Sequence, residues 1–126
     1  MPGILLAGSI PIHTPIVHVK IGKITLKSIL DSGADTSIIS EKLYYKISQK
    51  YRTKLGPSQL MNLKGVTGHD IVSVGSTRVH MEIGMLKFVL QFEVVRGITR
   101  GILLGSDFLN QTQAKLDYEN RNSKLA

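Results

Sequence analysis

The chain has 126 residues, a formal net charge of +7 and 42% hydrophobic residues, which fits one globular domain with a buried core and excludes an intrinsically disordered chain. It contains no cysteine, which excludes a disulfide framework, a thiolate zinc site and a thiol nucleophile. Its apolar stretches are far shorter than the roughly 20 residues that cross a bilayer. No basic residue precedes the short apolar run at the amino terminus, so a secretory signal is not expected.

Positive charge is spread thinly along the sequence. Sixteen Lys and Arg face nine Asp and Glu, and such an excess can attract polyanions. The basic residues stand singly, with no run of four or more, and only four Tyr and three Phe accompany them. The sequence therefore gives little support to the hypothesis of a basic barrel that binds nucleic acid, and no nucleic-acid partner is expected.

The predicted elements are mostly strands. Hydrophobic residues alternate over 17–21 and 24–26, with a hairpin turn at Gly22-Lys23. Residues 40–50 are the best helical candidate, with Ser40 as the N-cap. A long strand over 71–83 changes its apolar phase near Gly75-Ser76, which predicts a bulge, and residues 86–94 form the clearest strand, with a mostly polar second face. Six or more short strands with little helix favour an all-β barrel or sandwich.

An acidic turn between two apolar strand ends is the main chemical signal. It starts at Asp31-Ser32-Gly33, with Ile29-Leu30 before it and Ile38-Ile39 after it. A bare Asp-Ser-Gly triplet is usually a solvated β-turn. Here the apolar flanks hold the turn against a core, so a carboxylate at this position is partly desolvated. Its burial lowers the stability of the fold and has no evident structural role. This cost points to a functional role for Asp31.

Two further segments accompany the acidic turn. Residues 101–109 read as an apolar strand that ends in Gly105 and turns into a short helix near Ser106, and residues 63–70 read as a glycine-bounded hairpin tip. In this order and at these intervals, the three segments resemble the retropepsin family, the aspartic proteases of retroviruses, retrotransposons and pararetroviruses. Many retroviral members carry Arg where Ser106 stands, so the family's Arg partner for the residue matching Asp35 is missing here.

The resemblance covers about residues 14–118 and implies a fold and its limits. The expected fold is all-β: a small closed barrel of retropepsin type with a flap hairpin and one or two short helices, active as a C2 homodimer. The protease domain is placed at residues 12–118, between an N-terminal extension at 1–11 and a C-terminal tail at 119–126. The dimer is required because aspartic proteolysis uses two carboxylates that share one proton, and this chain supplies one such loop.

The resemblance also assigns roles to individual residues. Asp31 is the expected catalytic carboxylate, supported by Ser32, whose hydroxyl braces the two loops across the dimer, and by Gly33, which allows the tight turn. The flap tip is expected to close over the substrate and exclude water. The groove for an extended peptide is expected to be lined by Gly33, Ala34, Asp35, Gly65, Val66, Thr67, Gly68 and Ile102.

These roles predict an aspartic endopeptidase that cleaves a retroelement or viral polyprotein, including its own release, in the cytoplasm or inside a virus or virus-like particle. Mildly acidic pH should favour it. No cofactor, metal or membrane partner is expected. The sequence contains no Gly-x-Ser-x-Gly motif, which argues against a serine hydrolase. Its four His do not have the spacing of metal ligands, which argues against a His-ligated metal site. The serious alternative is a non-catalytic retropepsin-like domain, possessing the same fold, that dimerises or binds peptides within a cellular protein.

Overall fold

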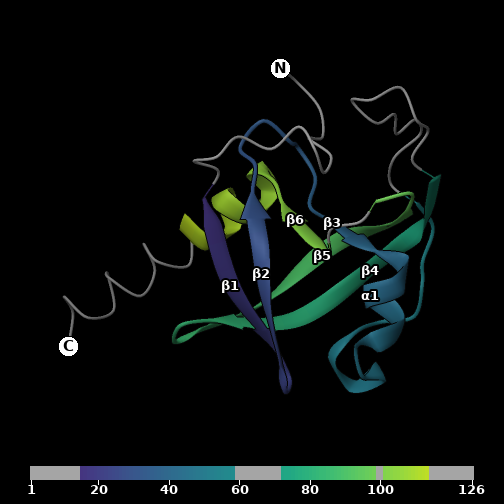
Figure 1. Cartoon of the computed structure of the whole chain (residues 1–126), viewed down its shortest axis with the longest axis horizontal. Coiled ribbons are helices and arrows are strands. Elements are labelled where there is room, and N and C mark those ends of the chain that lie inside the picture. Colours follow the sequence, from purple (N-terminus) through teal and green to yellow (C-terminus); the bar gives the residue numbers. More distant parts are fainter. Residues whose placement is uncertain (1–14, 59–71, 99–100, 114–126) are drawn as a thin grey trace.

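The computed structural model describes residues 15–58, 72–98 and 101–113, and the strands of this part close a barrel in the order β1-β2-β6-β3-β5-β4 (Figure 1). The elements in chain order are β1 (Ile16–Ile21), β2 (Ile24–Leu30), β3 (Ile38–Ser40), α1 (Glu41–Lys46), the 3-10 turn η1 (Gln49–Tyr51), β4 (Val72–Ile83), β5 (Leu86–Arg96) and β6 (Ile102–Leu104). Residues 106–113 are helical. The predicted closed all-β barrel with short helices is confirmed.

Both predicted irregularities of the strands are present. The β1–β2 hairpin turns at Gly22, whose φ of 59° is the left-handed conformation that glycine adopts without strain. In β4 the pairing with β5 shifts between Ser73 and Gly75. This shift is one or two residues earlier than the sequence predicted. A Cβ on Gly75 would lie 2.5 Å from the Gly56 carbonyl oxygen, so the bulge makes room for the segment that bridges β4 at Gly56↔Ser76.

The prediction of a single helix over residues 40–50 is wrong, because the helix is shorter. Ser40 caps α1 as expected, because its Oγ accepts the Leu43 N–H at 3.2 Å. The helix nevertheless ends at Lys46, and Ile47 takes an extended backbone with its side chain 2% exposed in the core. The Ile47 carbonyl accepts a bond from Arg52 Nε at 3.0 Å. Burial of Ile47 and this bond to Arg52 therefore replace the next helical turn.

The short strands β3 and β6 lie deep in the barrel and are buried on both faces. Because side chains alternate along a strand, Ile39 and Leu104 pack into the main core, while Ile38 and Leu103 pack into a second cluster. The main core holds Val19, Ile21, Ile39, Leu43, Tyr44, Ile47, Val79, Met81, Leu90, Phe92, Val94, Ile102, Leu104 and Phe108. The second cluster holds Ala34, Ile38, Val95 and Leu103, with Ile98 beside it.

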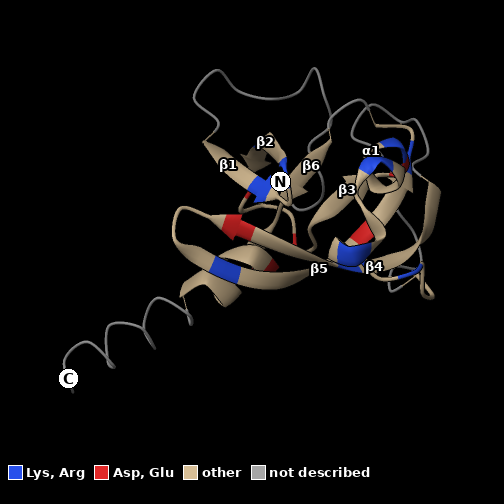
Figure 2. Cartoon of the chain, turned by 90° about the horizontal axis from the view of Figure 1, so that it is seen from below, with Lys and Arg blue, Asp and Glu red and all other residues tan. Residues whose placement is uncertain are grey.

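The charged side chains lie mainly on the outside. Figure 2 shows Lys and Arg spread over several strands and α1. Arg96, at the end of β5, binds Glu41 at the start of α1 through Nε–Oε1 at 2.8 Å and Nη2–Oε2 at 3.1 Å. This hydrogen-bonded pair lowers the pKa of Glu41 and raises the pKa of Arg96. In the described ranges no helix has the length and apolar character needed to span a membrane.

One buried hydroxyl predicts a stabilising substitution. Ser28 on β2 is 0% exposed, and among the described residues its Oγ has no hydrogen-bond partner. An unpaired buried polar group costs free energy. We expect Ser28→Ala to raise the free energy of unfolding by about 1 kcal/mol in urea titrations.

Ser40→Ala is the matched control for this substitution. It removes a buried serine whose Oγ caps α1, so we expect it to lower the free energy of unfolding by about 1 kcal/mol. If Ser28→Ala destabilised the chain as much as Ser40→Ala does, the Ser28 hydroxyl would not be unpaired.

Candidate active site

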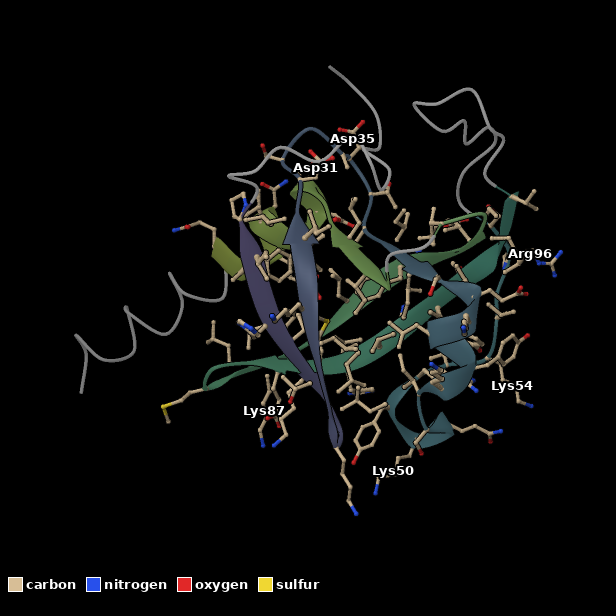
Figure 3. All side chains as sticks on the ribbon, in the orientation of Figure 1. Asp31, Asp35, Lys50, Lys54, Lys87 and Arg96 are labelled. Carbon is tan, nitrogen blue, oxygen red and sulfur yellow. The ribbon has the colours of Figure 1, made fainter. Side chains whose placement is uncertain are left out.

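Asp31 is the first residue after β2, and its position is fixed by the strand beside it. Strands β2 and β6 run parallel, with Leu30 opposite Leu104, and the Asp31 N–H donates to the Leu104 carbonyl at 2.8 Å. The Asp31 side chain is largely buried, with 8% of the residue exposed. Figure 3 shows Asp31 and Asp35 at one end of the barrel and Lys50 and Lys87 at the opposite end.

Two backbone amides of the following turn bond Asp31, one at its carboxylate and one at its backbone carbonyl. The Gly33 N–H donates to Asp31 Oδ1 at 2.9 Å, and the Ala34 N–H donates to the Asp31 carbonyl at 3.1 Å. Ser32 and Gly33 are exposed at the tip of the turn, whereas Ala34 is 0% exposed in the second apolar cluster. The predicted clamping of the acidic turn to the core is therefore present, and Asp31 is held between a buried strand and an exposed tip.

Residues 31–37 form a loop after β2, called the Asp31 loop. Gly105 lets the turn after β6 approach this loop closely. The Ser106 N–H donates to the Ala34 carbonyl at 2.7 Å. A Cβ on Gly105 would stand 2.6 Å from the Ala34 carbonyl oxygen and 3.0 Å from the Thr36 carbonyl carbon. No side chain fits in that space, so the contact between the two segments requires glycine at this position.

Asp35 is exposed at the edge of the loop. In the described part of the chain the ion pairs are Arg96–Glu41 and Lys87–Glu82, and none includes Asp35. This agrees with Ser106 in place of a cation, because a serine cannot form an ion pair with a carboxylate.

The other predicted groove residues lie apart from Asp31 or beyond the described ranges. Ile102 is 1% exposed within the main core, where it pairs with Ile39 in the sheet, so its role as a substrate contact stays a prediction. Gly65, Val66, Thr67 and Gly68 lie outside the described residues. The roles predicted for them stay predictions as well.

A buried carboxylate on β5 was missed by the sequence reasoning. Glu93 is 1% exposed. Its Oε1 accepts the Ser73 hydroxyl at 2.6 Å and also the Ser58 hydroxyl. A buried carboxylate needs such donors because its desolvation is costly. The mostly polar second face of residues 86–94 was the available signal, but alternation alone does not show that Glu93 on this face is buried. Ser37 and Asp107, which hold the end of the Asp31 loop, were also missed.

Two open surface hollows of the described residues lie away from Asp31, one of about 260 Å³ lined by Tyr51, His80 and Phe88 among others, and one of about 250 Å³ lined by Thr53, Ser76 and Arg78 among others. Neither contains a residue of the Asp31 loop. In the same ranges no group of three or more His, Asp or Glu is placed to hold a metal ion.

Asp31 therefore stands at a strand end, where its carboxylate accepts the Gly33 N–H of its own turn and its backbone bonds an apolar-apolar-Gly strand. A sequence model described as retroviral aspartyl protease matches residues 12–117. The chain therefore belongs to the retroviral aspartyl protease family, and it has the retropepsin-like fold.

Two solved structures support the fold. EIAV protease, in complex with the inhibitor HBY-793, matches with a TM-score of 0.63 and 26% identity over 81% of this chain and 90% of that one. The retroviral protease-like domain of Ddi1 from Leishmania major matches with a TM-score of 0.64 and 16% identity over 82% of this chain and 80% of that one. Members of this family work as dimers on polypeptide substrates.

The close approach at Gly105 predicts a strong effect of one methyl group. We expect Gly105→Ala to lower the free energy of unfolding by about 2–3 kcal/mol, because the new Cβ overlaps the backbone of the Asp31 loop. Amide chemical shifts of residues 31–37 should move in the same variant.

Gly56→Ala is the control, since a Cβ there meets Ser76 Oγ at 3.5 Å, an ordinary contact distance. Its free energy of unfolding should stay within about 1 kcal/mol of the parent chain. Equal effects of the two substitutions would show that space at Gly105 is not limiting.

Proposed function

We propose that this chain is an aspartic endopeptidase whose active form is a homodimer, with Asp31 of each copy meeting at the twofold axis. The observation that carries the proposal is the placement of Asp31, which is 8% exposed at the end of a retropepsin-like barrel and whose carboxylate accepts the Gly33 N–H. Burial of a carboxylate at this position destabilises the fold, and a role in peptide hydrolysis explains why a carboxylate is placed there.

The need for a second copy follows from the number of carboxylates that the reaction uses. Two carboxylates must share one proton, and the other described carboxylates are engaged elsewhere. Asp107 bonds Ser37, and Glu93 bonds Ser58 and Ser73. Glu41 and Glu82 pair with Arg96 and Lys87. Asp35 is exposed on the same loop. A partner Asp31 therefore supplies the second carboxylate in our proposal.

In the proposed reaction, the ionised carboxylate of the pair takes a proton from a water molecule. The water oxygen bonds to the carbon of the scissile carbonyl, while the protonated carboxyl donates a hydrogen bond to the carbonyl oxygen. The tetrahedral intermediate then collapses: the C–N bond breaks, and the leaving nitrogen takes up the proton that the carboxylate removed from water, which restores the singly protonated pair. Every step uses the two carboxylates and water, so no metal or cofactor is needed.

The proposed substrate is an extended polypeptide that pairs its main chain with the loop. Gly33, Ala34 and Asp35 border the proposed groove, with the segment 65–68 and Ile102 as further predicted contacts. Ser32, exposed beside Asp31, is proposed to brace the two loops across the dimer. Processing of a retroelement or viral polyprotein, including release of this chain, is the biological role we propose.

A second candidate function has one observation in its favour. The fold also occurs in the Ddi1 domain of Leishmania major, so a retropepsin-like barrel is not confined to viral proteins. In this candidate the chain dimerises or binds peptides without cleaving them. The two candidates differ in whether Asp31 is required, because a binding domain retains its partner affinity after Asp31→Asn.

We expect Asp31→Asn to reduce peptide cleavage at pH 4–7 by at least about a thousandfold, because it removes the base of the proposed mechanism. A statine-type transition-state analogue should inhibit the parent chain. The measurement is cleavage of a peptide library by each chain under conditions that favour the dimer.

Glu82→Gln is the matched control, because it removes one carboxylate charge on β4 without touching the Asp31 loop. It should cleave like the parent chain. Undiminished cleavage by Asp31→Asn would refute the aspartic mechanism, and a parent chain without cleavage would favour the binding domain.

Dimer dependence gives a further prediction. Because each copy supplies one Asp31, specific activity should fall on dilution in proportion to the loss of dimer. Sedimentation and activity should be followed over the same concentration range. Full activity at a sedimentation mass of 13.9 kDa would contradict the two-carboxylate argument.

A further inference from the structure

Ser37 ends the Asp31 loop, and every hydrogen-bonding group it has is engaged. It is 0% exposed. Its N–H donates to Asp107 Oδ2 at 3.0 Å, and its hydroxyl donates to Asp107 Oδ1 at 2.6 Å. The same Oγ accepts the Gly105 N–H at 3.0 Å, and the Ser37 carbonyl accepts the Glu93 N–H at 3.0 Å. Ser37 thus joins its loop to β5 and to the segment after β6.

Asp107 accepts hydrogen bonds from three donors, and the ion pairs formed among the described residues do not include it. Besides the N–H and hydroxyl of Ser37, it accepts the Phe108 N–H at 2.7 Å through Oδ1. Hydrogen bonds to an ionised carboxylate are shorter and roughly twice as strong as those between neutral groups. The bidentate contact with Ser37 also fixes the orientation of Ser37 relative to Asp107, because each carboxylate oxygen accepts one of its two donors. Asp107 is therefore a rigid clamp on the end of the loop.

The same short segment, residues 104–107, holds the loop at three points. The Leu104 carbonyl accepts the Asp31 N–H at 2.8 Å, and the Ser106 N–H donates to the Ala34 carbonyl at 2.7 Å. Asp107 then holds Ser37. Since Ser106 cannot form an ion pair with Asp35, the charged contact that braces this loop is made by Asp107 instead.

We propose that Asp107 and Ser37 are positioning residues for Asp31, which keep the loop in the geometry that lets two Asp31 carboxylates share a proton. This inference rests on the proposed function for its kinetic consequence. Neither residue touches the reacting atoms. A catalytic group displaced by about 1 Å can lose about a hundredfold in rate, so a loosened clamp should lower kcat more than it raises KM.

The kinetic test uses Asp107→Ala, Ser37→Ala and the double variant, assayed well below the Tm of each. We expect kcat to fall about 10- to 100-fold in each single variant, with KM within about threefold of the parent. The double variant should be no more than about threefold worse than the worse single one, because both break the same contact.

Asp107→Asn provides a conservative comparison. Its carbonyl oxygen can still accept the Ser37 hydroxyl and the Phe108 N–H, but its NH₂ group faces the Ser37 N–H, so the two donors oppose each other. We expect its kcat to lie between those of the parent and Asp107→Ala. Ser40→Ala is the control, since it removes a buried serine bond of α1 and should lower Tm with kcat unchanged. A kcat within twofold of the parent in both Asp107→Ala and Ser37→Ala would overturn the proposal.

Amide hydrogen exchange tests positioning without any need for cleavage. In Asp107→Ala the amides of Asp31 and Ser106, both bonded across the loop, should exchange at least about tenfold faster. The Gly56 amide, bonded to the Ser76 carbonyl at 2.8 Å, should not change. A parent chain without cleavage would refute the proposed function, whereas unchanged exchange at Asp31 and Ser106 would refute the positioning role.

Discussion

The contact between the Asp31 loop and the segment after β6 is the constraint on which the site depends. Gly105 permits it, since a Cβ at that position would lie 2.6 Å from the Ala34 carbonyl oxygen. Once the two backbones are this close, the Asp31 and Ser106 amides are both hydrogen-bonded across the gap. The buried strands β3 and β6 pair with each other, and the Asp31 N–H bonds the last residue of β6 (Figure 1). Asp31 is thus attached to the most buried part of the fold.

Polar groups buried near this contact share a pattern. Ser37 bonds Asp107, and Glu93 bonds Ser58 and Ser73. In both clusters a carboxylate accepts serine hydroxyls, and these neutral donors offset part of the cost of its desolvation. Hydrogen bonds of this kind fix direction as well as distance, which suits a loop whose proposed function depends on the orientation of one carboxylate.

The sequence predicted the regular parts of the fold because they obey local rules. Alternation identified the β1–β2 hairpin and β5, and the phase change identified the bulge in β4 to within two residues. Ser40 was recognised as an N-cap from its position before an apolar repeat. The helix predicted to residue 50 failed because Ile47 is buried in the core, which is a tertiary effect that helical propensity does not encode.

The chain order of an Asp-Ser-Gly turn, a glycine-bounded tip and an apolar-apolar-Gly strand was enough to indicate the family by resemblance. The same motif makes Asp31 the proposed catalytic carboxylate. The sequence could not show that Ser37 meets Asp107, since 70 residues separate them. Nor could it show that Glu93 is buried, since its alternation with apolar neighbours equally fits a solvent-facing residue. Only the closed barrel decided these contacts, because it brings β2, β5 and β6 together around one loop.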